Sequence, residues 1–257
     1  MKVIKKSNCK INLDLKIVGV KEGYHMLESV FCPICLFDEI VIEDYCEDVV
    51  FGMDIPQKEN IIYKTIKKFK DRYNIKKCVK VTINKKVPIQ AGLGGGSSNA
   101  ASVILGMNEL FNLKLEIDEM INFAKEIGSD VPFFIINKPS FVQGRGEIIK
   151  PLENFKKVYG ILVFDDIYMS TKEVFEVFDA LSEKEESNND LEQAVVKMPH
   201  GEKIKDIKNY LMECGCEMVS MSGAGGSVFG LCEKENLDII FDKVIRKYKK
   251  VWKFESI

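Results

Sequence analysis

Apolar and polar residues alternate along several stretches of the chain, and residues 8–18 show this most clearly. They read NCKINLDLKIV, with an apolar residue at every second position from Ile11 onward. A period of two predicts a strand with one buried and one polar face. Lys10 and Asn12 then share the polar face at the strand's start, and Asp14 and Lys16 on that face are interpreted as solvated. Further strands are expected at residues 27–31, 38–43, 79–83, 141–151, 158–164 and 249–254, with a glycine bulge inside residues 141–151.

Apolar residues three and four positions apart predict helices between these strands. In residues 59–73 they form one stripe, while the opposite face carries a run of basic residues. We interpret that run as a solvated helix face, with attraction of a polyphosphate substrate as the alternative. Gly128 is expected to end the helix of residues 118–127 in a left-handed conformation. Other helices are expected at residues 100–107, 171–181, 204–214 and 238–248. Periodicity alone therefore predicts a protein of mixed α and β structure.

Composition narrows the class of protein. The chain has 257 residues, of which 46% are hydrophobic, enough for one large domain or two small ones with a packed core. The formal net charge is −2, so no global charge favours nucleic acid or an anionic membrane. No apolar run approaches the roughly 20 residues that span a bilayer. The N-terminal MKVIKKSNCK has no apolar segment after its basic residues, so we expect no signal peptide and a cytoplasmic location.

The eight cysteines include one C-x-x-C pair, formed by Cys32 and Cys35. A second pair is absent and both histidines lie far away in the sequence, so a zinc or redox site is the less favoured interpretation. We expect mostly buried, reduced thiols, as is usual for a cytoplasmic protein.

Residues 88–99, PIQAGLGGGSSN, carry the strongest signal for chemistry. Gly92, Gly94, Gly95 and Gly96 fall within five positions, directly before a helical segment. Glycines let backbone N–H groups approach a ligand closely, and a helix N-terminus adds free donors and a positive dipole end. The pattern predicts an anion cradle, with phosphate as the favoured ligand and a plain loop as the alternative. It is neither a Walker A loop, since no lysine follows the glycines, nor a G-x-G-x-x-G fingerprint.

This segment, with the spacing Pro88-x-x-x-Gly92 and the run GLGGGSSN, resembles the nucleotide loop of the GHMP kinases. Three other motifs occur in order along the chain: K-x-N near the N-terminus, then G-Y-H, then G-x-D-V-P-F after the glycine loop. Together they resemble the branch whose substrate is 4-diphosphocytidyl-2-C-methyl-D-erythritol, in the non-mevalonate route to isoprenoids. The resemblance covers nearly the whole chain.

The resemblance implies ATP as phosphoryl donor and Mg²⁺ as its counterion, with no protein ligands defined for the ion. It implies that Asp130 is the general base and that Lys10 lies beside it and helps to orient the substrate hydroxyl. Taken alone, Asp130 would be interpreted as a helix N-cap. Asn60 is expected near the adenine. The other residues expected to bind the nucleotide are Pro88, Ile89, Gln90, Ala91, Gly92, Leu93, Gly94, Gly95, Gly96, Ser97 and Ser98.

The same resemblance implies a site for the cytidine-diphosphate substrate. Tyr24 is expected to stack on the cytosine and His25 to lie at its polar edge, while Asn12 lies near the acceptor end. Phe175 is expected to close the pocket, although a core phenylalanine is an equally good interpretation. Gly223 and Gly225 belong to a third glycine motif that packs against the phosphate loop, with Gly226 where the family usually has proline.

The fold implied by the resemblance is α+β, with an S5-like nucleotide-binding domain at residues 1–150 and a ferredoxin-like domain at residues 151–257. Two alternatives remain. One is a GHMP kinase for homoserine or a mevalonate-type alcohol, which needs no base-stacking tyrosine. The other is a non-catalytic nucleotide- or RNA-binding module, which the near-neutral charge and the presence of both Lys10 and Asp130 disfavour.

Overall fold

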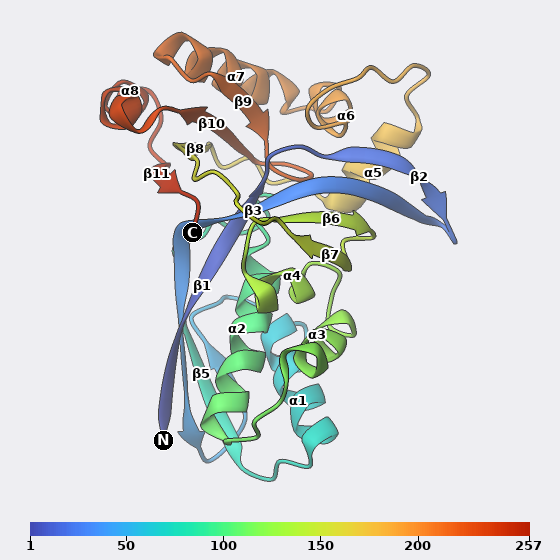
Figure 1. Cartoon of the computed structure of the whole chain (residues 1–257), viewed down its shortest axis with the longest axis vertical. Helices are drawn as coiled ribbons and strands as arrows, with labels where there is room; N and C mark the ends of the chain where they lie inside the picture. Colours follow the sequence, from blue (N-terminus) through green and yellow to red (C-terminus); the bar gives the residue numbers. More distant parts are fainter. The chain divides into compact units, whose positions relative to one another are not determined.

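The computed structural model describes all 257 residues, which form two compact units (Figure 1). Unit 1 comprises residues 1–9, 37–87 and 94–138, and unit 2 comprises residues 10–36, 88–93 and 139–257. Strands β1 (Lys2–Asn12) and β3 (Tyr24–Tyr45) contribute residues to both units. This division by contacts differs from a single cut at residue 150, which as a boundary between the two family domains stays a prediction.

Strand β3 is one element of 22 residues, whereas two strands at residues 27–31 and 38–43 were expected. The intervening residues are almost all apolar and stay extended, with Cys32 and Ile34 fully buried. In unit 1, residues 39–45 of β3 pair antiparallel with β5 (Cys78–Asn84). Strand β4 (Val49–Phe51) pairs parallel with the other edge of β5.

Four helices complete unit 1: α1 (Ile61–Tyr73), α2 (Gly95–Leu110), α3 (Ile117–Lys125) and α4 (Val131–Ile136). Four cations on the basic face of α1 are paired with two carboxylates, since Lys67 and Lys70 contact Asp48, and Lys68 and Arg72 contact Glu126. This pairing accounts for the basic run without a polyphosphate ligand.

The predicted end of α3 is wrong. The helix ends at Lys125 with Glu126 as its C-cap, and Gly128 is not in a left-handed conformation. Gly128 instead leads into the turn before α4, where its carbonyl accepts a hydrogen bond from the Val131 amide at 3.2 Å.

The N-terminal strand begins and ends six residues earlier than residues 8–18 predict. Strand β1 ends at Asn12, and β2 (Lys16–Lys21) starts a hairpin with β3 whose turn, Glu22 and Gly23, has positive φ at both residues. The break has a local cause, because the Asp14 carboxylate accepts a hydrogen bond from the Val30 amide at 2.5 Å. Asp14 is therefore a structural residue and not a solvated one.

Strands β6 (Ser140–Gly144) and β7 (Ile148–Pro151) form a hairpin, and β6 pairs with β3 at residues 27–31. Gly144 and Gly146, expected in a bulge, lie instead at its turn with φ of +74° and +112°. Positive φ at both positions suits a tight turn better than a strand interior.

A second sheet in unit 2 has the order β11-β8-β10-β9 and is antiparallel throughout. Its strands are β8 (Tyr159–Phe164), β9 (Met218–Met221), β10 (Ser227–Cys232) and β11 (Val251–Glu255). Helices α7 (Gly201–Cys214) and α8 (Leu237–Val244) pack against it (Figure 1). Helices α5 (Thr171–Asp179) and α6 (Glu192–Val196) and a short 3-10 turn (Lys234–Asn236) complete the unit.

The C-x-x-C pair does not form a joint site. Cys32 and Cys35 lie three residues apart on the extended β3, so their side chains point to opposite faces with Cα atoms about 10 Å apart. A disulfide needs Cα atoms within about 7 Å. Burial raises the pKa of the Cys32 thiol to about 12, which keeps it protonated and unreactive. None of the helices combines the length and the apolar character that a bilayer crossing requires.

Candidate functional site

The two glycine-rich segments of unit 2 are in direct contact, as the resemblance implies. A Cβ atom on Gly92, whose φ is +75°, would lie 1.9 Å from the Ser222 carbonyl oxygen and 2.7 Å from that of Gly225. The Ser222 hydroxyl donates to the Gly92 carbonyl at 3.0 Å, and the Ser227 amide donates to the Ala91 carbonyl at 3.2 Å. Only glycine fits at position 92, because the two backbones leave no room for a side chain.

The loop between β9 and β10 is anchored on its other side by Asn189. This side chain is fully buried, and its Nδ2 donates to the carbonyls of Met221 and Gly223, each at 2.9 Å. Gly226, the residue at the family's proline position, has a φ of +80°, and a Cβ there would lie 2.5 Å from the Ile167 carbonyl. The loop is thus held by packing and by hydrogen bonds, without the proline.

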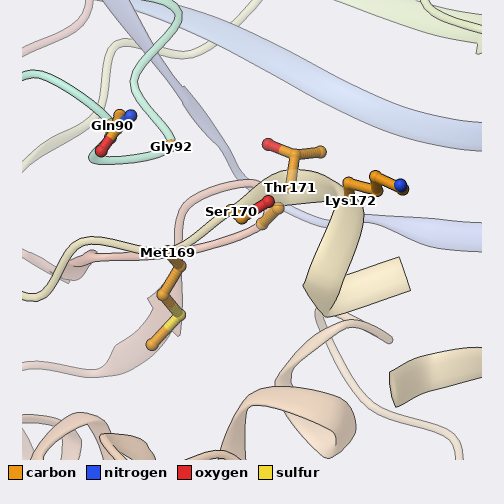
Figure 2. A pocket seen from close by; sticks show the side chains of 8 residues that line it. Gln90, Gly92, Met169, Ser170, Thr171 and Lys172 are labelled. Atoms are coloured by element: carbon orange, nitrogen blue, oxygen red, sulfur yellow. The ribbon is translucent and has the colours of Figure 1, made fainter. Parts of the chain in front are cut away.

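A cavity of about 360 Å³ opens between these glycine segments and the start of α5 (Figure 2). Figure 2 shows Gln90 and Gly92 on one loop, and Ser170 and Thr171 where the chain enters the helix. Ser170 caps α5 by accepting a hydrogen bond from the Glu173 amide at 3.4 Å. The cavity is lined by Gln90, Gly92, Met169, Ser170, Thr171, Lys172, Ala224 and Gly225.

Lys10 and Asn12 lie at the junction of both glycine segments and are buried, 4% and 1% exposed. The Lys10 amide donates to the Leu93 carbonyl at 3.0 Å, and the Asn12 amide donates to the Ser222 hydroxyl at 3.3 Å. The Lys10 ammonium donates to Asn12 Oδ1 and lies 4.5 Å from the centroid of the Phe31 ring. The structure thereby brings these two predicted residues together with Gly92 and Gly223, whose Cβ would lie 3.3 Å from Asn12 Oδ1.

In unit 1 the glycine run itself forms the first turn of α2. The helix begins at Gly95, ahead of the expected residue 100, and Gly94 is its N-cap with a φ of +66°. The amides of that first turn have no partner within the helix, which leaves donors for an anion. Gly96 is exposed and Ser97 is half-buried, whereas Ser98 is buried and accepts a hydrogen bond from Ser7 Oγ at 2.8 Å. Ser97 is therefore the hydroxyl left at the surface of this turn.

A buried carboxylate that sequence reasoning missed lies beneath this turn. Asp38 is fully buried and accepts hydrogen bonds from Lys85 Nζ at 2.6 Å and Asn99 Nδ2 at 2.9 Å. It also accepts from the amides of Lys86 and Val87. A Cβ on Gly95 would lie 3.2 Å from Lys85 Nζ, so Asp38 holds a cation beside the glycine run. The available signal was a charged residue at the start of the predicted strand DEIVIE, where Glu39 and Glu43 are charged as well.

Asn60 caps α1 through Oδ1, which accepts from the Ile62 amide at 2.9 Å. Its Nδ2 is buried without a hydrogen-bond partner, so a donor remains free at this point. The starts of α1 and α2 are neighbours, because a Cβ on Gly96 would lie 4.0 Å from Ile61 Cγ2. An unsatisfied donor next to the glycine turn is what an acceptor on a nucleotide base would need.

Asp130 occupies the N-cap position of α4, but its side chain makes no capping hydrogen bond and its backbone is helical. The interpretation of this aspartate as a simple N-cap is therefore wrong. Its carboxylate is half-buried and belongs to unit 1, whereas Lys10 belongs to unit 2, so their pairing stays a prediction.

Among the residues expected at the cytidine, the structure brings His25 and Phe175 together. Their rings stack with centroids 4.5 Å apart and planes 23° apart, and His25 Nε2–H donates to Asp179 Oδ1 at 2.8 Å. Tyr24 is 51% exposed, and the Arg145 guanidinium lies 3.6 Å from its ring centroid. Asp179 and Arg145 were not foreseen, since neither belongs to a motif.

Comparison with known proteins agrees with this geometry. Residues 60–138 match the GHMP kinases N terminal domain, and residues 173–250 match the GHMP kinases C terminal domain. The chain belongs to the GHMP kinase family. The two matches lie on either side of residue 150 and cover the glycine turn of α2, Asp130 and Phe175.

Curated relatives and solved structures are similar to this GHMP kinase over almost its full length. It is 34% identical to the 4-diphosphocytidyl-2-C-methyl-D-erythritol kinase of Clostridioides difficile (strain 630), over 98% of this chain and 94% of the relative. It is 37% identical to the kinase of the same name from Azobacteroides pseudotrichonymphae genomovar. CFP2, over 88% and 92%. A crystal structure of 4-(cytidine 5'-diphospho)-2C-methyl-D-erythritol kinase is 26% identical with a TM-score of 0.85, covering 99% of both chains.

The fold is shared more widely than the sequence. The mevalonate kinase of Methanococcus jannaschii superposes on this GHMP kinase with a TM-score of 0.76 at 16% identity, over 100% of this chain and 99% of the other. At that identity the likeness shows the fold alone. The two-domain α+β fold expected from the motifs is confirmed by the two domain matches together with these structures.

Proposed function

We propose that this GHMP kinase transfers the γ-phosphoryl group of ATP to the 2-hydroxyl of 4-diphosphocytidyl-2-C-methyl-D-erythritol. Two relatives named 4-diphosphocytidyl-2-C-methyl-D-erythritol kinase are 34% and 37% identical to this chain over most of its length. The observation that carries the proposal is the exposed Tyr24 of unit 2, which precedes His25, whose ring stacks on that of Phe175. An exposed tyrosine ring suits a flat base, because stacking needs aromatic area.

The nucleotide is held by the glycine segment, residues 88–98. The free amides of the α2 turn fit phosphate oxygens. The unpartnered Nδ2 of Asn60 supports a base nearby. No three His, Cys, Asp or Glu side chains gather into a metal cage. Mg²⁺ is usually held by substrate phosphates, water and one or two protein groups, and Ser97 is the half-buried hydroxyl placed to contribute. When bound, Mg²⁺ supplies neutralisation of the phosphate charge.

The chemical step asks little covalent work of the protein. In this proposal the Asp130 carboxylate accepts the proton of the substrate 2-hydroxyl, and that oxygen forms a bond to the γ-phosphorus. The bond from the γ-phosphorus to the β,γ-bridging oxygen breaks, and ADP leaves with the electron pair. Lys10 orients the hydroxyl, and Asn12 fixes the Lys10 ammonium.

Other acceptors are the main alternative, because homoserine and mevalonate kinases share the fold. Neither of those small acceptors contains a base that would use Tyr24. A module without catalytic activity would have no need of an aspartate freed from helix capping. The first consideration favours the cytidine substrate over the smaller acceptors, and the second favours an enzyme over a module without catalytic activity.

The test is a coupled assay of ADP release with ATP and Mg²⁺, run separately with the cytidine-diphosphate substrate, homoserine and mevalonate. Release with the cytidine substrate alone is the expected result. Release with another alcohol would keep the kinase and discard the acceptor. No release with any acceptor would remove the catalytic proposal.

A further inference from the structure

Two side chains of helix α5, Phe175 and Asp179, contact His25 at the start of β3. Phe175 and Asp179 are four residues apart on α5, so they lie on the same face of the helix. Between them they hold the His25 imidazole, with Phe175 stacked on its face and the Asp179 carboxylate accepting its Nε2–H at 2.8 Å. The His25 side chain is only 17% exposed as a result, whereas that of Asp179 is 54% exposed.

The position of Asp179 conflicts with the preferences of a helix. Asp179 is the last residue of α5, where the partial negative charge of the helix end disfavours a carboxylate. Local conflicts of this kind tend to mark functional positions. An alanine at this position would suit the helix at least as well, so stability of the helix does not explain the aspartate.

The other end of α5 forms a wall of the cavity. Ser170, Thr171 and Lys172 line it opposite Gln90 and Gly92 of the glycine segment. A rigid helix that is fixed at its C-terminal half places its N-terminal turn at a defined distance from those glycines. The contact of Asp179 with His25 therefore bears on the cavity and on Phe175 together.

We propose that Asp179 is a positioning residue for the acceptor substrate, acting through His25 to hold Phe175 and α5 in their binding positions. The inference rests on the proposed function, since it assigns the acceptor site to Phe175 and the α5 side of this cavity. Asp179 does not touch the reacting groups. Its loss raises the KM for the cytidine substrate and leaves kcat and the KM for ATP unchanged.

The experiment compares Asp179→Ala and Asp179→Asn with the control Glu173→Ala, which removes the same charge from an exposed position on the same helix. Asp179→Ala is expected to raise the acceptor KM about three- to tenfold, the range of a lost aromatic contact, with kcat and ATP KM within about twofold of wild type. Asp179→Asn keeps an oxygen acceptor for the histidine and should return the acceptor KM to within about threefold of wild type. Glu173→Ala should match wild type in all three constants.

A thermal unfolding scan separates positioning from stability. Asp179→Ala should unfold within a few degrees of wild type, because relief of the unfavourable charge at the helix end offsets the lost hydrogen bond to His25. If Asp179→Ala unfolded at a lower temperature, and if kcat fell while both KM values rose, the residue would have a structural role and the inference would be overturned. Unchanged acceptor KM in Asp179→Ala would overturn it as well. If the wild-type enzyme does not phosphorylate the cytidine substrate, the proposed function fails instead, which is a separate result.

Discussion

Replacing Gly92 by alanine tests the contact between the two glycine segments most directly. The new Cβ would lie 1.9 Å from the Ser222 carbonyl oxygen, and an ordinary contact requires 3.4 Å, so the two backbones must separate by about 1.5 Å (3.4 − 1.9). The two atoms nearest the new Cβ, the carbonyl oxygens of Ser222 and Gly225, belong to the backbone and cannot rotate away as a side chain would. The change therefore disrupts the contact and does not merely crowd it.

The cost can be built from two contributions. Holding a residue other than glycine in the left-handed region costs about 1–2 kcal/mol. Separation by that distance also stretches the hydrogen bonds Ser222 Oγ–H to Gly92 and Ser227 N–H to Ala91 beyond bonding range, at about 1 kcal/mol each. The sum is about 3–4 kcal/mol, which corresponds to a fall in unfolding temperature of roughly 10 °C for a chain of this size.

Gly23 provides a matched control. Its φ is +77°, close to the +75° of Gly92, but a Cβ there meets no atom within 4 Å. Gly23→Ala should pay only the conformational cost, about 1–2 kcal/mol or roughly 5 °C. The assay is thermal unfolding of both variants with ATP affinity measured by calorimetry. If Gly92→Ala unfolded at the same temperature as Gly23→Ala and bound ATP normally, the close approach would not exist and the cradle would have to be abandoned.

Four shorter predictions concern the site and the core. Asp130→Ala should lower kcat at least a hundredfold, the low end for a general base, while calorimetry finds ATP binding intact; near-normal turnover would exclude the base assignment. Tyr24→Ala should weaken acceptor binding by about 1–3 kcal/mol, the free energy of a lost stack, which steady-state kinetics would show as a higher acceptor KM; an unchanged KM would exclude the stack. Asn60→Ala should raise the KM for ATP without affecting the acceptor, and equal effects on both would contradict its place at the nucleotide. Burial raises the pKa of Cys32 from 9.0 to about 12, so the folded state keeps a proton that the unfolded chain loses, and stability should fall as pH rises above 9. Urea unfolding at pH 8 and pH 10 should show that fall reduced in Cys32→Ala but not in the exposed Cys46→Ala; equal falls in all three proteins would contradict the burial.

The motifs and most elements were predictable because they depend on residues that are close in sequence. The glycine run, the helix after it and strands β8 and β11 of the second sheet follow local rules of period and turn chemistry. Alternation misplaced Asp14, whose carboxylate accepts a hydrogen bond from the Val30 amide, 16 positions away. A pattern of polar residues marks a solvated face only when no distant segment covers it.

Residues whose role depends on distant pairing escaped prediction. Asp38 gains its meaning from Lys85 and Asn99, which are 47 and 61 positions away. Asn189 acts on a loop more than 30 positions further on, through two carbonyls. Buried polar groups must be paired, but a single sequence does not say with which partner. The resemblance supplied the residues of the motifs and could not supply these supports.

The conformation of Gly226 bears on how such an enzyme can be engineered. Consensus design replaces an unusual residue by the one most common among relatives, and here it would insert the proline that the family usually carries. Proline holds φ near −65°, whereas Gly226 has a φ of +80°. The substitution would force the β9–β10 loop into another path and pull Ser222 from Gly92. The residue that rigidifies this loop in its relatives would unfasten it in this chain, so the two loops are alternative solutions that cannot be exchanged one position at a time.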